Sequence, residues 1–216
     1  MPRTKKRLVD DSLIVSGRDK AISNVFVYLL RSTIRAQDTD TSNKTLITSP
    51  VVLMLRDGRF EPHAVWLQDS QPLVVANQDS ETCYLKFDDQ EIAPELASTS
   101  GRLSIEPAGQ KVVSVKRFNN RPGQIVGLHP GWLRCPILVS DHPYAAITDK
   151  DGNFAIKHVP IGEWKFGVYH ERARSIEKVF IDGKAVEWKH GRFAYSIHPD
   201  NNSLGTIEVP ADAFAK

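Results

Sequence analysis

The stretch from Asp141 to Glu171 constrains the fold of this chain more than any other part of the sequence. It contains a turn sequence, Asp-Lys-Asp-Gly at residues 149–152, in which Asp-Gly supplies the positive φ that a tight hairpin needs. Apolar side chains alternate with polar ones after this turn, at Phe154, Ile156, Trp164, Phe166 and Val168. A period of two bounded by turns indicates β-strands. We therefore predict strands at residues 146–148 and 153–158, and a third strand from residue 164 onward.

Short apolar segments separated by turn sequences continue through the rest of the chain. We predict further strands at residues 24–30, 46–55, 64–67, 73–76, 83–87, 112–115, 124–128, 135–139, 178–181, 193–197 and 205–209. Residues 31–45 are polar and rich in threonine, and residues 88–109 show little periodicity, so we expect loops there. No segment longer than about ten residues has the apolar spacing of a helix. Many short strands are typical of a sandwich or barrel, so we predict an all-β fold.

Composition and charge exclude several classes of protein. The 216 residues are 41% hydrophobic and 25% charged, which gives room for one large or two small domains. The net charge of +2 is too small to favour nucleic acid, and no apolar run is long enough for a membrane span. The N-terminal residues are basic, but no apolar signal segment follows them, so the sequence as given predicts no export signal.

Two parts of the chain resemble known families. Residues from Leu53 to Val139 resemble the cupredoxins, the blue-copper β-sandwiches, through RFEPHAVWLQDSQPLVVANQDSETC and RPGQIVGLHPGWLRCPILV. The segment ITDKDGNFAIKHVPIGEWKFGVYHE resembles the transthyretin-like regulatory repeat found beside carboxypeptidases. Together with DHPYAA and WKHGRF, they are similar to bacterial cupredoxin-like proteins of the methylamine-utilisation type. The resemblance implies a cupredoxin-like Greek-key β-sandwich plus a smaller transthyretin-like β-sandwich.

The order of the two resemblances bears on the domain organisation. The repeat has an N-V-x-V-x-L strand shortly before its T-D-x-D-G hairpin, whereas here that strand, Asn24 to Leu29, lies far upstream. We infer that a cupredoxin-like domain of residues 45–140 is inserted into a transthyretin-like domain made of residues 8–33 and 141–216. The alternative is a tandem arrangement of residues 1–140 and 141–216.

The resemblance also implies where copper would bind. A type-1 copper site needs two imidazoles, a thiolate and a weak thioether ligand. Cys83 stands where the first histidine is expected, and Val126 or Gly127 stands where the cysteine is expected. His129 is kept, and Leu133 replaces the methionine. We therefore predict a degenerate type-1 copper site in which His129 and Cys83 are the remaining candidate metal ligands.

The cysteines and tryptophans leave alternatives open. Cys83 is a buried inert thiol, a partner of His129 for Cu(I) or zinc, or one half of a disulfide with Cys135 in an oxidising compartment. The chain has four tryptophans, which we expect in the core and at domain contacts: Trp66, Trp132, Trp164 and Trp188.

These observations favour a non-enzymatic protein without a bound cofactor, with a binding or structural role through an unidentified protein partner. The expected loops at 31–45 and 88–109 are natural places for recognition. The alternative is a copper-binding or electron-transfer protein with a rearranged Cys/His site. A transthyretin-like hydrolase would need histidines in one pocket, and the candidates are His142, His158 and His170. The resemblance implies a periplasmic or exported protein, but without a visible signal the compartment stays open.

Overall fold

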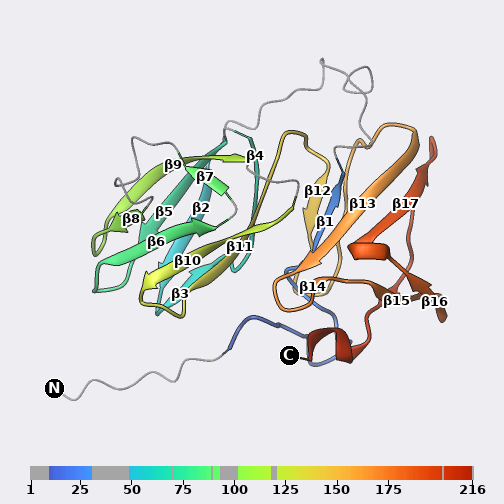
Figure 1. Cartoon of the computed structure of the whole chain (residues 1–216), viewed down its shortest axis with the longest axis horizontal. Coiled ribbons are helices and arrows are strands. Elements are labelled where there is room, and N and C mark those ends of the chain that lie inside the picture. The colour runs from blue at the N-terminus through green and yellow to red at the C-terminus, as the bar shows by residue number, and fades with distance from the viewer. Residues whose placement is uncertain are drawn as a thin grey trace.

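The structure is a computed structural model that describes residues 10–30, 49–69, 71–88, 90–92, 102–117, 121–200 and 202–215 (Figure 1). Its strands are β1 (Phe26–Leu29), β2 (Val51–Arg56), β3 (Arg59–Glu61), β4 (Val65–Gln68), β5 (Pro72–Asn77), β6 (Cys83–Asp88), β7 (Gln90–Ile92), β8 (Arg102–Ile105), β9 (Gln110–Arg117), β10 (Gly123–His129), β11 (Arg134–Ser140), β12 (Ala145–Ile147), β13 (Gly162–His170), β14 (Arg174–Ser175), β15 (Lys178–Ile181), β16 (Lys184–Glu187), β17 (Arg192–Ile197) and β18 (Ile207–Glu208). In the described part of the chain, helical structure is limited to the 3-10 turns η3 (Lys189–Gly191) and η4 (Ala211–Phe214). The prediction of an all-β fold is confirmed. None of the helices among the described residues has the length and apolar character of a membrane span.

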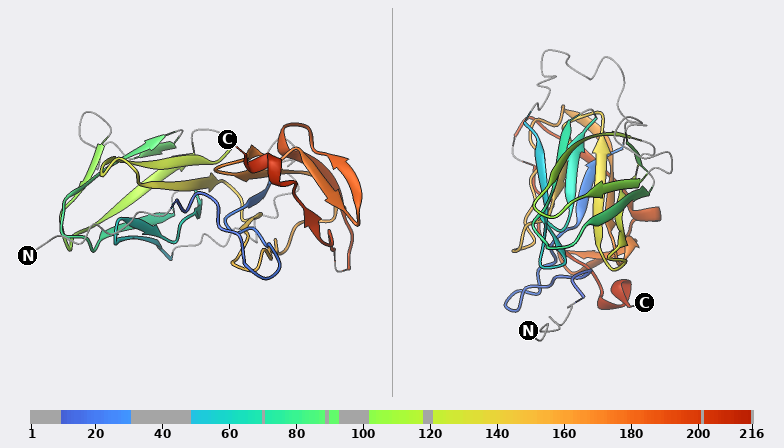
Figure 2. Two further views of the ribbon diagram at one scale, coloured as in Figure 1. Left: turned by 90° about the horizontal axis from the view of Figure 1, so that it is seen from below. Right: turned by 90° about the vertical axis from the view of Figure 1, so that its left-hand side faces the viewer.

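Two five-stranded sheets form a sandwich from the middle of the chain (Figure 2). One sheet has the order β3-β2-β5-β9-β7, and the other has the order β4-β11-β10-β6-β8. Alternate side chains of each strand point into the space between the sheets. In β6, for example, Cys83, Leu85 and Phe87 are buried while Tyr84 and Lys86 are exposed. The shared core takes side chains from both sheets, among them Leu53, Leu73, Val113, Leu85, Ile125 and Ile137. We refer to this part as the first sandwich.

The strands before and after the first sandwich form a separate sheet. Its order is β12-β1-β13-β14, and β17 also pairs with β13. β1 is antiparallel to both β12 and β13, so residues 26–29 lie beside residues 145–147 and 166–169. A further sheet, β16-β15-β18, lies beside it (Figure 1). We refer to these strands together as the second unit.

Both faces of β1 are buried, as its nearly continuous apolar sequence requires. Val25 and Val27 point to one side, where they pack with Val168, Trp188 and other residues of the second unit. The side chains on the opposite face contact the first sandwich in a cluster that contains Phe26, Tyr28, Leu30, Ala64, Leu138 and Ala145. β1 therefore belongs to the second unit by hydrogen bonding and contacts the first sandwich by packing.

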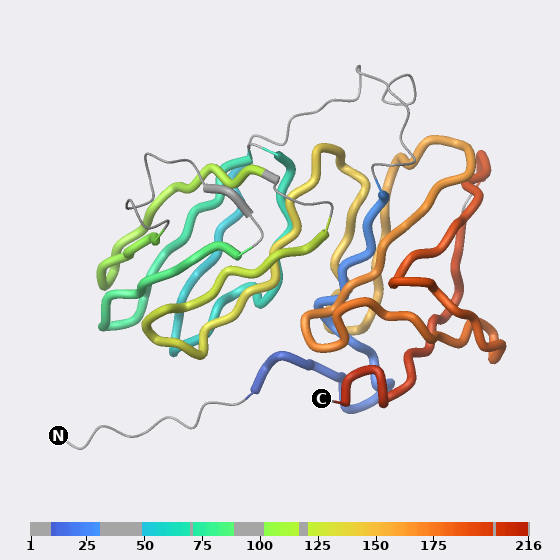
Figure 3. The backbone as a smooth tube through the Cα atoms, in the orientation of Figure 1, coloured from blue at the N-terminus to red at the C-terminus, as the bar shows by residue number. Residues whose placement is uncertain are grey.

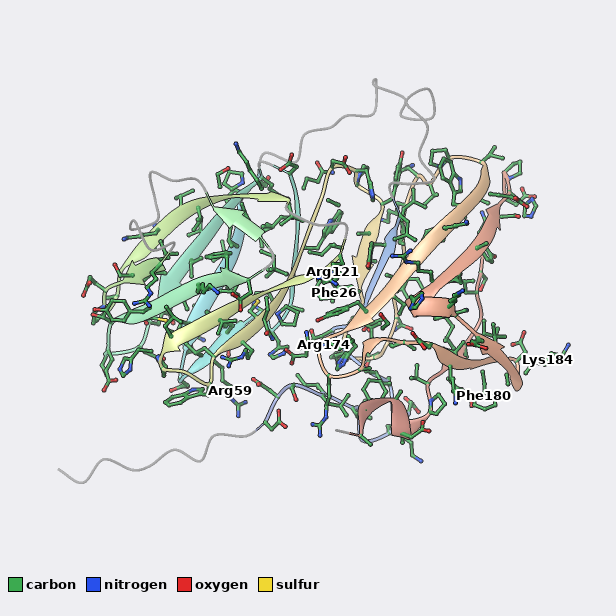
Figure 4. The ribbon with its side chains drawn as sticks, viewed as in Figure 1. Phe26, Arg59, Arg121, Arg174, Phe180 and Lys184 are labelled. Carbon is green, nitrogen blue, oxygen red and sulfur yellow. The ribbon has the colours of Figure 1, made fainter. Side chains whose placement is uncertain are left out.

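Phe26 lies where the two parts of the molecule meet (Figure 4). Next to it, Tyr28 lies over Gly167 of β13, where a Cβ atom would be 2.7 Å from Tyr28 Cζ. A side chain at position 167 would push the Tyr28 ring away, so glycine permits the close approach. Polar groups complete the contact, because Trp66 Nε1 donates to Ser140 Oγ at 2.8 Å and Ser140 Oγ donates to the His142 carbonyl at 2.7 Å.

Three sequence-based expectations about local structure are wrong. Residues 153–158 form no strand, although Phe154 and Ile156 pack against the core of the second unit, so their alternation reflects side-chain burial rather than backbone pairing. The expected loop at 88–109 contains β7 and β8, and β8 is so short that its alternation consists of Leu103 and Ile105 alone, both of which are buried. Trp132 is 55% exposed rather than part of the core. The expected loop at 31–45 lies outside the described residues.

The packing of β1 predicts a large cost for shortening Phe26, which is fully buried. Replacement by alanine should lower the free energy of unfolding by about 3–5 kcal/mol, because it removes an aromatic ring and leaves a cavity. As a matched control, Phe180→Ala removes a ring that is 37% exposed and should change the free energy by less than about 1 kcal/mol. Urea unfolding of both variants measures the difference. Equal effects would contradict the role assigned to the β1 contact.

Candidate functional site

The turn between β10 and β11 is where the sequence predicted most of a copper site. The Gly127 amide donates to the Leu133 carbonyl at 2.9 Å and closes the turn. A Cβ atom on Gly127 would lie 2.2 Å from the Pro130 carbonyl oxygen and 2.7 Å from Leu133 Cβ. Backbone occupies that space, so the turn has no room for a cysteine side chain at position 127. The Leu133 side chain is itself in the core of the first sandwich and is 2% exposed.

Cys83 and His129 lie on neighbouring strands but face opposite ways. His129 pairs with Tyr84, the residue after Cys83, and partners across a ladder share one face of the sheet. Tyr84 is 43% exposed and His129 is also exposed, whereas Cys83 is 1% exposed and points into the core. The structure therefore separates the two predicted metal ligands, and a metal site made by them stays a prediction.

The thiols are also in an unreactive state. Burial, with a smaller contribution from the Asp79 charge, raises the pKa of Cys83 to about 12. Burial likewise raises the pKa of Cys135, whose Sγ is 3.6 Å from the Pro136 carbonyl. A protonated thiol is a poor metal ligand, because the thiolate is the form that binds. Both cysteines are free, so the disulfide alternative is wrong. Within the described ranges, no three His, Cys, Asp or Glu side chains gather to hold a metal ion.

A cavity of about 320 Å³ lies at one end of the first sandwich, next to this turn. Four separate segments line it, and their residues are Asp10, Asp11, Ser12, Gly58, Arg59, Phe60, Trp132, Leu133, Arg134 and Glu171. Figure 3 shows how the chain from Asp10 passes from the first sandwich toward the second unit, where it lies near the C-terminal turn η4. Arg172 connects the N-terminal segment to η4, because its guanidinium is 3.2 Å from the Asp10 carboxylate and donates to the Phe214 carbonyl at 2.9 Å.

A buried ion pair lies behind the cavity and links the two parts of the molecule. His63, between β3 and β4, has its Nε2 2.7 Å from Oε1 of Glu171, which follows β13. The two side chains are only 9% and 6% exposed. An ionised carboxylate only accepts hydrogen bonds, so Nε2 carries the proton. Nδ1 of His63 is buried without a hydrogen-bond partner among the described residues, and Asp11 Oδ2 is 3.7 Å from it.

The surroundings shift the two nearby histidines in opposite directions. Burial of His63 lowers its pKa, but the hydrogen bond and charge of Glu171 and the charge of Asp11 outweigh burial, so the pKa is raised overall. Burial lowers the pKa of His170 to about 4, and the positive charges of His63 and Arg172 add to this effect. His170 is accordingly neutral, and its Nδ1 accepts from the Arg172 amide at 3.2 Å.

The histidines of the hydrolase alternative do not contribute to this cavity. His142 is buried between the two parts of the molecule, with Nε2 3.1 Å from the Leu29 carbonyl. His158 is exposed, and His170 packs edge-on against Phe214 at a centroid distance of 5.3 Å. None of the three lines the cavity. The sequence provided no sign of the cavity itself, because the residues that form it are far apart in the chain.

The comparisons with known proteins give only distant similarities. The chain matches no family model and no curated protein sequence. Among solved structures, it is similar to a mutant of amicyanin in the Cu(I) form, with 8% identity and a TM-score of 0.32 over 42% of this chain and 82% of that chain. It is also similar to an oxidised mutant of amicyanin, with 10% identity and a TM-score of 0.31 over 45% of this chain and 88% of that chain.

The tight turn predicts that Gly127→Ala is destabilising by about 1–3 kcal/mol, because the new methyl group overlaps the Pro130 carbonyl. Gly131→Ala in the same turn is the matched control. Its nearest contact would be the Leu128 carbonyl oxygen at 4.0 Å, so its stability should change by less than about 1 kcal/mol. Thermal or urea unfolding measures both. A stable Gly127→Ala variant would show that the turn opens readily.

The buried ion pair predicts a pKa above 6.5 for His63. Since the pKa is raised in the folded state, the protonated ring stabilises the fold fully below pH 6.5, and this stabilisation is lost as the pH rises through the folded-state pKa. NMR titration of the ring is the right measurement, because the lowered pKa of His170 gives overall stability a pH dependence of opposite sign below pH 6.5.

In that titration, Glu171→Gln should lower the His63 pKa, because it removes the negative charge 2.7 Å away. Glu163→Gln, at an exposed position of β13, should leave it unchanged. An unaltered His63 titration in Glu171→Gln would contradict the assigned cause.

Proposed function

We propose that this chain is a non-enzymatic, cupredoxin-like binding protein whose type-1 copper site has degenerated. The observation that carries the proposal is the packing around the turn between β10 and β11. Backbone fills the space next to Gly127, and Leu133 is part of the hydrophobic core. Cys83 points into that core as a protonated thiol, while His129 faces solvent. None of the four positions at which the resemblance implies a copper ligand therefore offers a thiolate.

We also propose that the cupredoxin-like domain of residues 45–140 is inserted into a transthyretin-like domain of residues 8–33 and 141–216. The pairing of β1 with β12 and β13 supports insertion over the tandem alternative, because a strand from before the first sandwich completes a sheet formed after it. A transthyretin-like unit at this place would present the first sandwich on a second β-framework.

The binding role is supported by the exposed Trp132 beside the cavity. A tryptophan ring that is 55% exposed is unusual on a surface without a contact role, and aromatic side chains are enriched in interfaces. Its Nε1 donates to the Gly58 carbonyl at 3.2 Å, which holds the ring at the cavity. We propose that a partner or ligand is recognised here.

The second candidate function is a copper protein that uses Cys83 and His129 in a rearranged site. Copper titration with absorption spectroscopy separates the two functions. Under our proposal, copper added as Cu(II), or as Cu(I) under reducing conditions, leaves the protein on desalting, and no intense visible band develops. A band at one copper per chain that disappears in both Cys83→Ala and His129→Ala would establish the rival. Cys135→Ala, which removes the other buried thiol, serves as the matched control.

A further inference from the structure

We propose that the cavity beside Trp132 is a binding site for a carboxylate, held by Arg59 and Arg134. The carboxylate can belong to a small organic acid or to the C-terminus of a peptide. This inference rests on the proposed binding function and specifies its ligand. Some polar groups of the cavity already have partners, and others have unused hydrogen-bonding capacity.

The acidic groups of the cavity are largely engaged. Asp10 accepts from the Ser12 amide at 3.0 Å and pairs with Arg172 at 3.2 Å. Glu171 pairs with His63 at 2.7 Å. Asp11 makes longer contacts, with His63 Nδ1 at 3.7 Å and Arg59 Nε at 4.0 Å. A cationic ligand would therefore compete with a resident basic group at Asp10 and at Glu171, whereas Asp11 has only the two longer contacts.

The guanidinium groups have more unused capacity. The guanidinium of Arg59 makes no hydrogen bond to another described residue, and its nearest described carboxylate is that of Asp11, 4.0 Å away. Arg134 uses Nη1 alone, which donates to the Gly131 and Leu133 carbonyls at 2.9 and 2.7 Å. Its Nε and Nη2 have no carboxylate partner in the described ranges. Figure 4 shows Arg59 at the end of the first sandwich, toward the N-terminal segment.

The lining of the cavity contains two guanidinium groups and three carboxylates. Two of these carboxylates have a basic partner outside the lining, since Asp10 pairs with Arg172 and Glu171 pairs with His63. Arg59 and Arg134 therefore remain the groups suited to an anion. Guanidinium groups bind carboxylates through two parallel hydrogen bonds, a geometry that a cation cannot use. The unused donors of Arg59 and Arg134 therefore indicate a carboxylate ligand.

The cavity also accommodates an apolar body next to the carboxylate. Its volume of about 320 Å³ is at the lower end of the range for small-molecule sites. Phe60 and Leu133 line it with apolar atoms, and the exposed Trp132 ring offers a flat surface. An aromatic or aliphatic group attached to the carboxylate fits this lining.

The test uses NMR of the full chain, with the indole N–H of Trp132 as the reporter, assigned with Trp132→Phe. Benzoate should shift this signal saturably, and uncharged benzamide should not. Arg59→Gln and Arg134→Gln should each weaken benzoate binding about tenfold or more, because each removes charge-assisted hydrogen bonds. Arg102→Gln, at an exposed position of β8, is the matched control and should bind as the unaltered protein does.

Peptides distinguish the two sources of the carboxylate. A Gly-Gly-Phe peptide that binds more tightly than benzoate, and loses binding when its C-terminus is amidated, identifies a peptide terminus. Benzoate binding with weaker binding of the peptide identifies a small acid. The proposal would be overturned if neither benzoate nor the peptide bound saturably, or if benzamide bound as tightly as benzoate. It would also be overturned if both arginine variants kept full affinity for benzoate and an unchanged melting temperature. Copper binding at Cys83 and His129 would overturn the proposed function instead, so the two failures are distinguishable.

Discussion

The burial of both faces of β1 is the constraint on which the rest of the structure depends. The strand is hydrogen-bonded on both edges, to β12 and β13, and its side chains enter three clusters. Val27 and Leu29 enter two clusters of the second unit, and Phe26 and Tyr28 enter a third, which contacts the first sandwich. A four-residue strand thus determines how the second unit meets the first sandwich. The ion pair of His63 and Glu171 joins the same two parts of the molecule, and Glu171 also lines the cavity.

Packing that stabilises the first sandwich also fills the positions where the resemblance implies copper ligands. In the turn between β10 and β11, the hydrogen bond from Gly127 to Leu133 brings backbone close to position 127. The same turn directs Leu133 into the core, next to other apolar side chains. A ligand set would need polar atoms that point toward a common centre, whereas packing favours apolar atoms that exclude water. At these positions the structure satisfies the second requirement.

The sequence allowed the prediction of most strands, because alternation is a local property. β13 was predicted from Trp164, Phe166 and Val168, and these three side chains are buried. The same argument failed at Phe154 and Ile156, where side chains are half-buried without strand pairing. Trp132 was expected in the core because apolar character alone does not reveal that its turn projects from the sandwich.

The cavity could not be predicted for a different reason. Its lining comes from residues 10–12, 58–60, 132–134 and Glu171, which no local pattern connects. The partner of His63 is likewise distant in the sequence, because Glu171 is 108 positions away in the chain. The packing of the second unit against the first sandwich places these groups side by side.

The central claim is that packing has replaced metal binding in a cupredoxin-like framework. Anomalous X-ray scattering at the copper absorption edge, from crystals grown with excess copper, tests it most directly. The account predicts no copper peak in the space between β6 and β10 that Cys83 and His129 would share. A full-occupancy peak bonded to Cys83 Sγ and the His129 ring would contradict it.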